Sequence, residues 1–155
     1  MAPVRPSNND AGDPYAHNEA FWDEVTPVHA ASDYYQLDKF RTGENVLHDF
    51  IVEEVGDVTG LSMLHLQCHF GLDTLNWARL GAVTTGVDIS GASVERGQDL
   101  SAELSIPSTF VQANVLEMGD RFDGLFDRVF TSIGALCWIG DLAAWGEVVA
   151  RALKP

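Results

Sequence analysis

Apolar side chains recur at helical spacing in the first sixty residues. In the stretch "AHNEAFWDEV", Ala20, Phe21 and Val25 share one helix face, and Pro27 is expected to end that helix. A second apolar stripe runs up to Gly56, a residue type that commonly stops helices. Its members are Val46, Leu47, Phe50, Ile51 and Val55. The pattern therefore predicts a largely helical segment over residues 15–60.

From Leu61 onward, short apolar runs alternate with amphipathic ones. The runs "SMLHLQ", "VTTGVDIS", "STFVQANV" and "FDRVFTSIGAL" are expected to be strands. The segments between and after them predict three helices: "GLDTLNWARLGA", closing at Gly81, "SGASVERGQDLSAELSI", ending before Pro107, and "DLAAWGEVVARALKP", with Asp141 as its N-cap. This alternation predicts an α/β fold, with a mostly parallel sheet covered by helices on both faces. In such sheets, ligands bind beyond the carboxyl ends of the strands.

Composition and charge narrow the class of protein. The 155 residues suffice for one domain, and 46% apolar with 21% charged residues is ordinary for a globular protein. The net charge of −14 repels phosphate backbones, and no basic cluster is present, so a nucleic-acid substrate is not expected. No apolar run reaches membrane-spanning length, so no membrane partner is expected either. Residues 1–14 are rich in Pro, Asn and Asp and are predicted to be a disordered tail without a secretory signal. With only two cysteines, a reduced cytoplasm is the simplest compartment.

The stretch "HLQCHFG", residues 65–71, lies where the first strand turns into a helix, and it admits three interpretations. His65, Cys68 and His69 are possible metal ligands, but no second ligand pair stands nearby at zinc spacing, and no metal is expected. Alternatively, His65 is a buried strand histidine and Cys68 a small core residue. Finally, a strand–turn–helix presents backbone N–H groups to a nucleotide ligand, although only Gly71 remains of the usual glycine-rich signature.

Asp88 supports the nucleotide interpretation. It closes "GVD" at the end of the next predicted strand, at the separation expected for an acid that binds ribose hydroxyls. An aspartate after a strand is also often the N-cap of the following helix, a role that Ser90 fills equally well. Because the turn and the acid occur together, ribose binding is the favoured interpretation.

The order and spacing of several stretches resemble one family. They are "FWDEVTPVH", "LHLQCHFGLDTLNWARLGA", "TGVDIS", "FVQANV", "FDRVFTSIGALCWIGDLAAW" and "VARALKP". From Asn18 to Pro155, the chain resembles the class I S-adenosylmethionine-dependent methyltransferases, and within them a group of bacterial small-molecule-type enzymes. The resemblance implies a Rossmann-like domain over residues 61–155, a helical N-terminal cap over residues 15–60, S-adenosylmethionine as cofactor and a small-molecule methyl acceptor.

The resemblance also implies which residues bind the cofactor. His65 stands where the family usually has an acid, Gln67 and His69 stand at glycine positions, Gly71 keeps its glycine, and Cys68 helps to shape the same turn. The other expected contacts follow the next three strands: Asp88 and Ile89 at the ribose, Ala113 and Asn114 beside the adenine, and Thr131 and Ser132 near the methionine part. Asn114 replaces a more usual aspartate, and its amide oxygen can still accept from the adenine amino group.

Acceptor-side residues are harder to identify, because methyl transfer relies mainly on placing a nucleophile in line with an activated methyl group. His29 is a candidate general base, since its ordinary pKa lies near neutrality, although a surface role without chemistry is an equal alternative. Trp22 and Trp138 are interpreted first as packing residues. For Tyr34 and Tyr35, closing over the cofactor and anchoring the loop remain open alternatives.

The sequence stops at "ALKP", where the family normally continues with a fifth strand and a hairpin. We therefore expect a truncated fold whose C-terminal strands are missing, and either a homodimer or a partner that completes the sheet. Two other functions stay open. One is an NAD-dependent oxidoreductase, against which the missing G-x-G-x-x-G counts. The other is a non-catalytic module that binds cofactor or a partner.

Overall fold

The computed structural model describes residues 13–155, so the predicted disordered tail lies almost entirely outside the described residues. Four strands form one parallel sheet in the order β3-β2-β1-β4. The strands are β1 (Ser62–Leu66), β2 (Val83–Asp88), β3 (Thr109–Gln112) and β4 (Arg128–Thr131). The helices are α1 (Pro14–Ala30), α2 (Leu37–Arg41), α3 (Asp49–Val55), α4 (Leu72–Arg79), α5 (Gly91–Leu104) and α6 (Leu142–Ala152), with short 3-10 turns η2 (Asp33–Tyr35), η3 (Val115–Glu117) and η4 (Leu136–Trp138).

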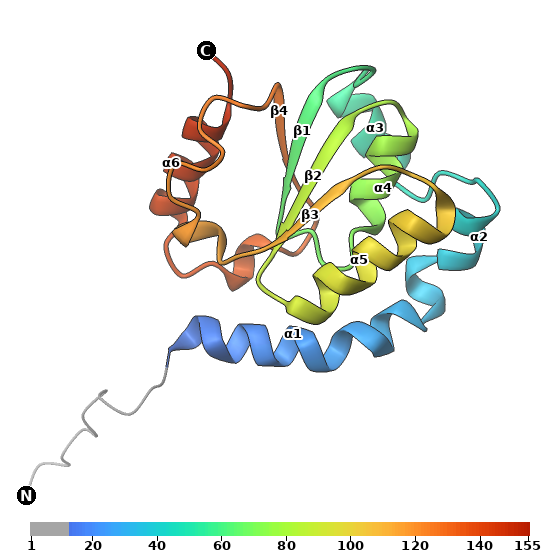
Figure 1. Cartoon of the computed structure of the whole chain (residues 1–155), viewed down its shortest axis with the longest axis horizontal. Coiled ribbons are helices and arrows are strands. Elements are labelled where there is room, and N and C mark those ends of the chain that lie inside the picture. Colours follow the sequence, from blue (N-terminus) through green and yellow to red (C-terminus); the bar gives the residue numbers. More distant parts are fainter. Residues whose placement is uncertain (1–12) are drawn as a thin grey trace, which may run out of the picture.

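The sheet is covered on both faces, as the alternating pattern predicted. Figure 1 shows α6 on one side of the strands and α4 and α5 on the other. Side chains of β1 alternate between these layers: Leu64 and Leu66 pack in the cluster that includes Val148 of α6, whereas Met63 packs with Trp77 of α4. Because β1 is buried on both faces, it reads as a nearly continuous apolar run. The α/β, Rossmann-like fold is therefore confirmed.

The expected end of the first helix at Pro27 is wrong, because α1 continues to Ala30. A proline inside a helix removes one backbone hydrogen bond, but Pro27 lies in the last turn, where little helix remains to be disrupted. The preceding residue also anchors this turn. The hydroxyl of Thr26 donates to the carbonyl of Trp22 at 2.6 Å and contacts the hydroxyl of Ser93 on α5, also at 2.6 Å.

The apolar stripe that ends at Val55 is only partly helical. Its last turns form α3, and Gly56 ends that helix with a positive φ of 75°, as predicted. Val46 and Leu47 lie in the preceding loop instead, where the backbone N–H of Val46 donates to the side chain of Asn76 at 3.1 Å. A hydrogen bond to α4 and packing against it therefore hold these two residues outside the helix that the sequence predicted.

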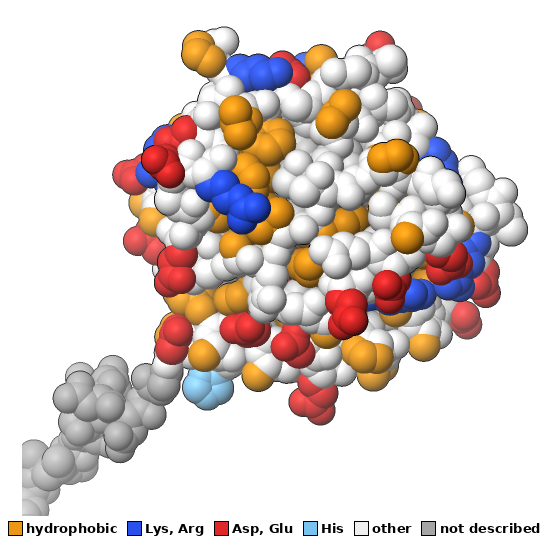
Figure 2. Space-filling view, viewed as in Figure 1, with side chains coloured by type: hydrophobic (Ala, Val, Ile, Leu, Met, Phe, Trp, Pro, Cys, Tyr) orange, Lys and Arg blue, Asp and Glu red, His pale blue; other side chains and the backbone are white. Residues whose placement is uncertain are grey.

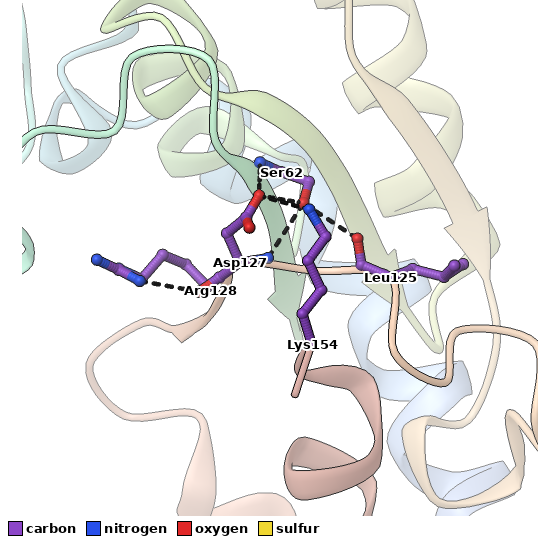
Figure 3. A network of polar contacts seen from close by, with 5 residues as sticks. All are labelled: Ser62, Leu125, Asp127, Arg128 and Lys154. Carbon is purple, nitrogen blue, oxygen red and sulfur yellow. Dashed lines mark hydrogen bonds and ion pairs between the residues drawn. The ribbon is translucent and has the colours of Figure 1, made fainter.

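A polar network fixes the amino ends of β1 and β4 to the end of the described chain (Figure 3). The carboxylate of Asp127 accepts from the backbone N–H of Ser62 at 2.8 Å and from Nζ of Lys154 at 2.8 Å. These bonds hold the pKa of Asp127 well below its ordinary value. Beside it, the backbone of Phe126 pairs with residues 152–154 in parallel fashion.

The acidic balance of the sequence is visible at the surface. Figure 2 shows carboxylates scattered over one face of the molecule, with fewer basic side chains among them. Within residues 13–155, no helix is both long enough and apolar enough to cross a membrane.

Candidate functional site

A cavity of about 730 Å³ opens beyond the carboxyl ends of the strands, a volume typical of small-molecule sites. Segments from the cap and from the sheet line it together. Among the lining residues are Trp22, Tyr34, Tyr35, His48, Gln67, Cys68, His69, Asp73, Asp88, Ile89, Ala113, Asn114, Ser132 and Trp138. Most of the residues predicted to bind cofactor are therefore gathered in one place. Its position agrees with the rule for ligand sites in open parallel sheets.

The turn after β1 has a left-handed backbone at alternate residues. The φ angles of Gln67, His69 and Gly71 are 52°, 51° and 75°. Glycine adopts this conformation freely, whereas residues with a side chain adopt it at a cost in free energy. Two backbone hydrogen bonds hold the turn: Cys68 N–H donates to the Val87 carbonyl at 3.0 Å, and Gly71 N–H donates to the Cys68 carbonyl at 2.9 Å.

Asp88 ties this turn to the end of β2. One carboxylate oxygen accepts from the backbone N–H of His69 at 2.7 Å, and the other accepts from the backbone N–H of Ser90 at 2.9 Å. Burial raises the pKa of Asp88, while these backbone donors oppose that shift. The side chain is 7% exposed and each oxygen keeps a lone pair for a ligand. Asp88 is not the N-cap of α5. Ser90 has that role, because its side chain accepts from the backbone N–H of Ser93 at 3.0 Å.

Gln67 and Thr131 join β1 to β4 and α6. The hydroxyl of Thr131 donates to the carbonyl of Leu66 at 3.0 Å, so its oxygen must accept from the amide NH₂ of Gln67 at 2.8 Å. In that orientation, the amide oxygen of Gln67 accepts from Nε1 of Trp145 at 3.2 Å. Gln67 lines the cavity, whereas Thr131 supports it from behind.

The residues after β3 reach the cavity beside Asp88. The backbone N–H of Ala113 donates to the carbonyl of Asp88 at 2.8 Å, which aligns the two strand ends. The side-chain oxygen of Asn114 accepts from Leu116 N–H at 3.1 Å and so caps η3. One lone pair of that oxygen and the amide N–H groups stay available to a ligand. Ile89 and Ser132 complete this end of the wall.

His65 does not line the cavity, although the sequence placed it at the cofactor. Its side chain is buried on the α4 side of β1, and Nδ1 lies 2.8 Å from the hydroxyl of Thr74. Burial lowers its pKa to about 3, so the ring is neutral. Cys68 is buried as well, and burial raises the pKa of its thiol. Both residues therefore fit the core interpretation that the sequence left open, and Cys68 also touches the cavity.

Within residues 13–155, no group of three or more His, Cys, Asp or Glu side chains is arranged to hold a metal ion. His69, which the sequence offered as a ligand, instead contacts two other side chains. Its Nε2 lies 3.1 Å from Nδ1 of His29, and its Nδ1 lies 3.0 Å from the hydroxyl of Ser93. Burial and the neighbouring His29 lower the pKa of His69 to about 4.

Aromatic side chains of α1 and η4 together form the opposite wall. Trp22 packs edge-on against Trp138 with ring centres 5.1 Å apart, and Phe21 stacks on Trp138 at 5.4 Å. Both tryptophans line the cavity, so their packing also builds the site. His29 lies behind Tyr35 and does not line the cavity.

Asp73 and His48 are site residues that the sequence reasoning missed. Asp73 lies in the first turn of α4, two residues after Gly71, and both Asp73 and His48 line the cavity. Burial raises the pKa of Asp73 to about 6, and His48 partly opposes that shift. The available signal was an acidic residue at the start of the helix that follows the turn. His48 offered no such signal, because its place depends on a loop brought in from the cap.

The chain is similar to known methyltransferases. Residues 63–155 match the family described as "Methyltransferase domain". A ubiquinone biosynthesis O-methyltransferase of Alkalilimnicola ehrlichii is 30% identical over 107 residues, which cover 69% of this chain and 43% of the relative. Another, from Proteus mirabilis, is 27% identical over 150 residues, which cover 86% and 61%. The chain thus spans about half the length of the curated relatives it matches.

A solved S-adenosylmethionine-dependent methyltransferase of Mesorhizobium loti superposes with a TM-score of 0.61 at 24% identity, covering 74% of this chain and 51% of that one. At this identity the likeness shows the fold alone. The family match covers more than half of the chain. The chain therefore belongs to the methyltransferase domain family, with the fold of the class I S-adenosylmethionine-dependent methyltransferases.

Proposed function

We propose that this chain binds S-adenosylmethionine and transfers its methyl group to a small-molecule acceptor. One observation carries the proposal: the Asp88 carboxylate closes the left-handed turn at residues 67–71 and faces the cavity where β1 and β2 end. A buried carboxylate with free lone pairs beside such a turn suits a pair of ribose hydroxyls. The family match and the names of the relatives support the same reaction.

The residues present fit the cofactor. Asp88 would hold the ribose, with Ile89 beside it, and Ala113 and Asn114 would hold the adenine. Gln67, His69 and Ser132 would surround the amino-acid end, while Thr131 acts only through Gln67. When bound, the cofactor supplies an already activated methyl group, so the protein contributes orientation and the exclusion of water. The aromatic wall from Trp22 to Trp138 serves that exclusion.

The charges of the cavity limit the acceptor. The lining residues include Asp49, Asp73 and Asp88 but no Lys or Arg within the described part of the chain. An anionic acceptor would meet like charges without a compensating cation, so we propose a neutral or cationic small molecule. Asp73 replaces His29 as the proposed general base, because it lines the cavity and has a pKa of about 6.

We also propose that residues 15–60 act as a cap on a methyltransferase domain over residues 61–155. The cytoplasm is the proposed compartment, since Cys68 and Cys137 are both free thiols.

The test is a transfer assay with S-adenosylmethionine labelled at the methyl group. The chain is incubated with panels of neutral hydroxyl compounds, amines and carboxylic acids, and labelled product and S-adenosylhomocysteine are quantified. We expect turnover with a neutral or cationic acceptor, and a large loss in Asp73→Asn with retained S-adenosylhomocysteine binding. Cofactor binding without transfer to any panel would instead indicate a non-catalytic binding module. NADH binding in place of S-adenosylhomocysteine would contradict the proposal altogether.

A further inference from the structure

A chain of hydrogen bonds links α1 to the turn at residues 67–71. The donor and acceptor roles along this chain are fixed at Thr26. The hydroxyl of Thr26 donates its single proton to the Trp22 carbonyl at 2.6 Å, because a carbonyl only accepts. The 2.6 Å contact between Thr26 and Ser93 must then use the Ser93 proton. Ser93 can therefore only accept from Nδ1 of His69, which lies 3.0 Å away. His69 consequently carries its proton on Nδ1.

The protonation of His69 determines that of His29. Because burial keeps the His69 ring neutral, its Nε2 is an acceptor, and it lies 3.1 Å from Nδ1 of His29. Two ring nitrogens that both present lone pairs at this distance would repel each other. His29 must therefore carry a proton on Nδ1 and donate it toward His69.

The proton on Nδ1 of His29 in turn determines the role of the Tyr35 hydroxyl. Its hydroxyl oxygen lies 3.1 Å from Nδ1 of His29, so that N–H is shared between His69 and Tyr35, and Tyr35 acts as an acceptor in this contact. The proton of the Tyr35 hydroxyl is then not used by His29. Among the described residues, no other hydrogen-bond partner lies within reach of this hydroxyl, and Tyr35 lines the cavity.

We propose that the His29–His69 pair sets Tyr35 as a hydrogen-bond donor to a carboxylate oxygen at the amino-acid end of the bound cofactor. This inference rests on the proposed function. Tyr35 packs against Phe70 and His69 of the turn at residues 67–71, with ring centres 4.9 Å and 5.7 Å apart, and His69 is one of the residues proposed to surround the amino-acid end. The described cavity wall has no Lys or Arg, so a carboxylate bound there needs neutral donors. In this arrangement, His29 and His69 are positioning residues.

The ligand arm compares S-adenosylhomocysteine with 5′-methylthioadenosine, which lacks the amino-acid end, in calorimetric titrations. In Tyr35→Phe, we expect the Kd of S-adenosylhomocysteine to rise about tenfold or more, because a hydrogen bond to a charged group is lost. The Kd of 5′-methylthioadenosine should stay within about twofold, since its carboxylate is missing. Asp33→Asn is the control, because this exposed side chain lies in the same 3-10 turn as Tyr35 but does not line the cavity.

The positioning arm uses His29. His29→Asn keeps an N–H donor near the original Nδ1 and should bind S-adenosylhomocysteine within about threefold of the unmodified chain, whereas His29→Ala should lose about as much as Tyr35→Phe. The tautomers are read independently by nitrogen NMR of labelled histidines at pH 8. We expect His69 with its proton on Nδ1 and none on Nε2.

Three results would overturn the inference. The first is a His69 proton on Nε2, which breaks the chain of reasoning whatever the ligand. The second is an equal effect of Tyr35→Phe on both ligands, or an equal loss in Asp33→Asn. In the third, the unmodified chain binds neither ligand, and the proposed function fails together with the carboxylate contact, while the NMR result still decides the tautomers.

Discussion

At the scale of single residues, the turn after β1 has residues with side chains at left-handed backbone positions, which glycine adopts most easily. Gln67 and His69 adopt positive φ angles, and each is held by hydrogen bonds that a glycine lacks. The turn after β1 and the position of Asp88 at the end of β2 follow the sequence prediction, because strand, turn and acid keep a regular spacing. The prediction misplaced His65, because a strand buried on both faces gives no sign of which face points to a ligand.

The turn packs closely against Phe110 at Gly71. An alanine there would retain a φ of +75°, and its Cβ would clash with the edge of the Phe110 ring at Cε1 and Cζ. We expect Gly71→Ala to lower the free energy of unfolding by about 2–4 kcal/mol, from the left-handed strain plus overpacking. Gly60 has the same φ of +75° with open space around it, so Gly60→Ala should cost only about 1 kcal/mol. Urea unfolding measures both, and equal losses would show that the Phe110 contact is unimportant.

Burial of Asp73 makes the free energy of unfolding depend on pH. Burial raises its pKa from 3.8 to about 6, so the folded state holds the proton more tightly than the unfolded state does. Its contribution to stability therefore falls as pH rises from about 4 to 6, and it stays unfavourable above that range. Relative to the unmodified chain, Asp73→Asn should gain on the order of 1 kcal/mol between pH 5 and pH 7.5 in urea unfolding. The exposed control Asp33→Asn should show no such gain, and a flat difference for Asp73→Asn would contradict the assignment.

At the scale of elements, the strands and helices after residue 61 follow the sequence pattern closely, because each carries a clear period and boundary residues such as Asp141, which caps α6. The cap deviates from it. Pro27 fails to end α1, and Val46 and Leu47 leave their helix, because contacts with α5 and α4 outweigh local preference. Sequence periodicity contains no information about such contacts.

Docking of α1 depends on one carboxylate. Oδ1 of Asp23 accepts from the Ser90 hydroxyl at 2.6 Å and from the Ala92 N–H at 3.0 Å, at the amino end of α5. We expect Asp23→Asn to lower the free energy of unfolding by about 1–2 kcal/mol, because a charged acceptor at a helix N-terminus is lost. S-adenosylhomocysteine binding should weaken as well, since α1 forms a cavity wall. Glu24→Gln, on the exposed side of α1, is the control, and identical effects of the two variants would refute a specific role for Asp23.

At the scale of the whole molecule, the site is assembled from segments that are distant in the sequence. Figure 1 shows α1 lying across the end of the sheet, and the cavity forms between them. The sequence identified the sheet side of this site through strand ends, which parallel topology brings together. It missed His48, because only the fold brings the loop that carries this residue to the cavity, and it missed Asp73, although this acid begins the helix that follows the turn. The acidic surface and the absence of Lys and Arg from the described cavity wall favour a neutral or cationic acceptor.

The most direct measurement is calorimetric titration of S-adenosylhomocysteine into the unmodified chain and into Asp88→Asn, with Asp33→Asn as control. Asparagine preserves the size of the side chain but removes the charge and one of the two acceptor oxygens. We predict saturable binding that weakens about tenfold or more in Asp88→Asn and is unchanged in Asp33→Asn. Equal affinity of the folded Asp88→Asn variant and the unmodified chain, or no binding by either, would contradict the assignment of this cavity to the cofactor.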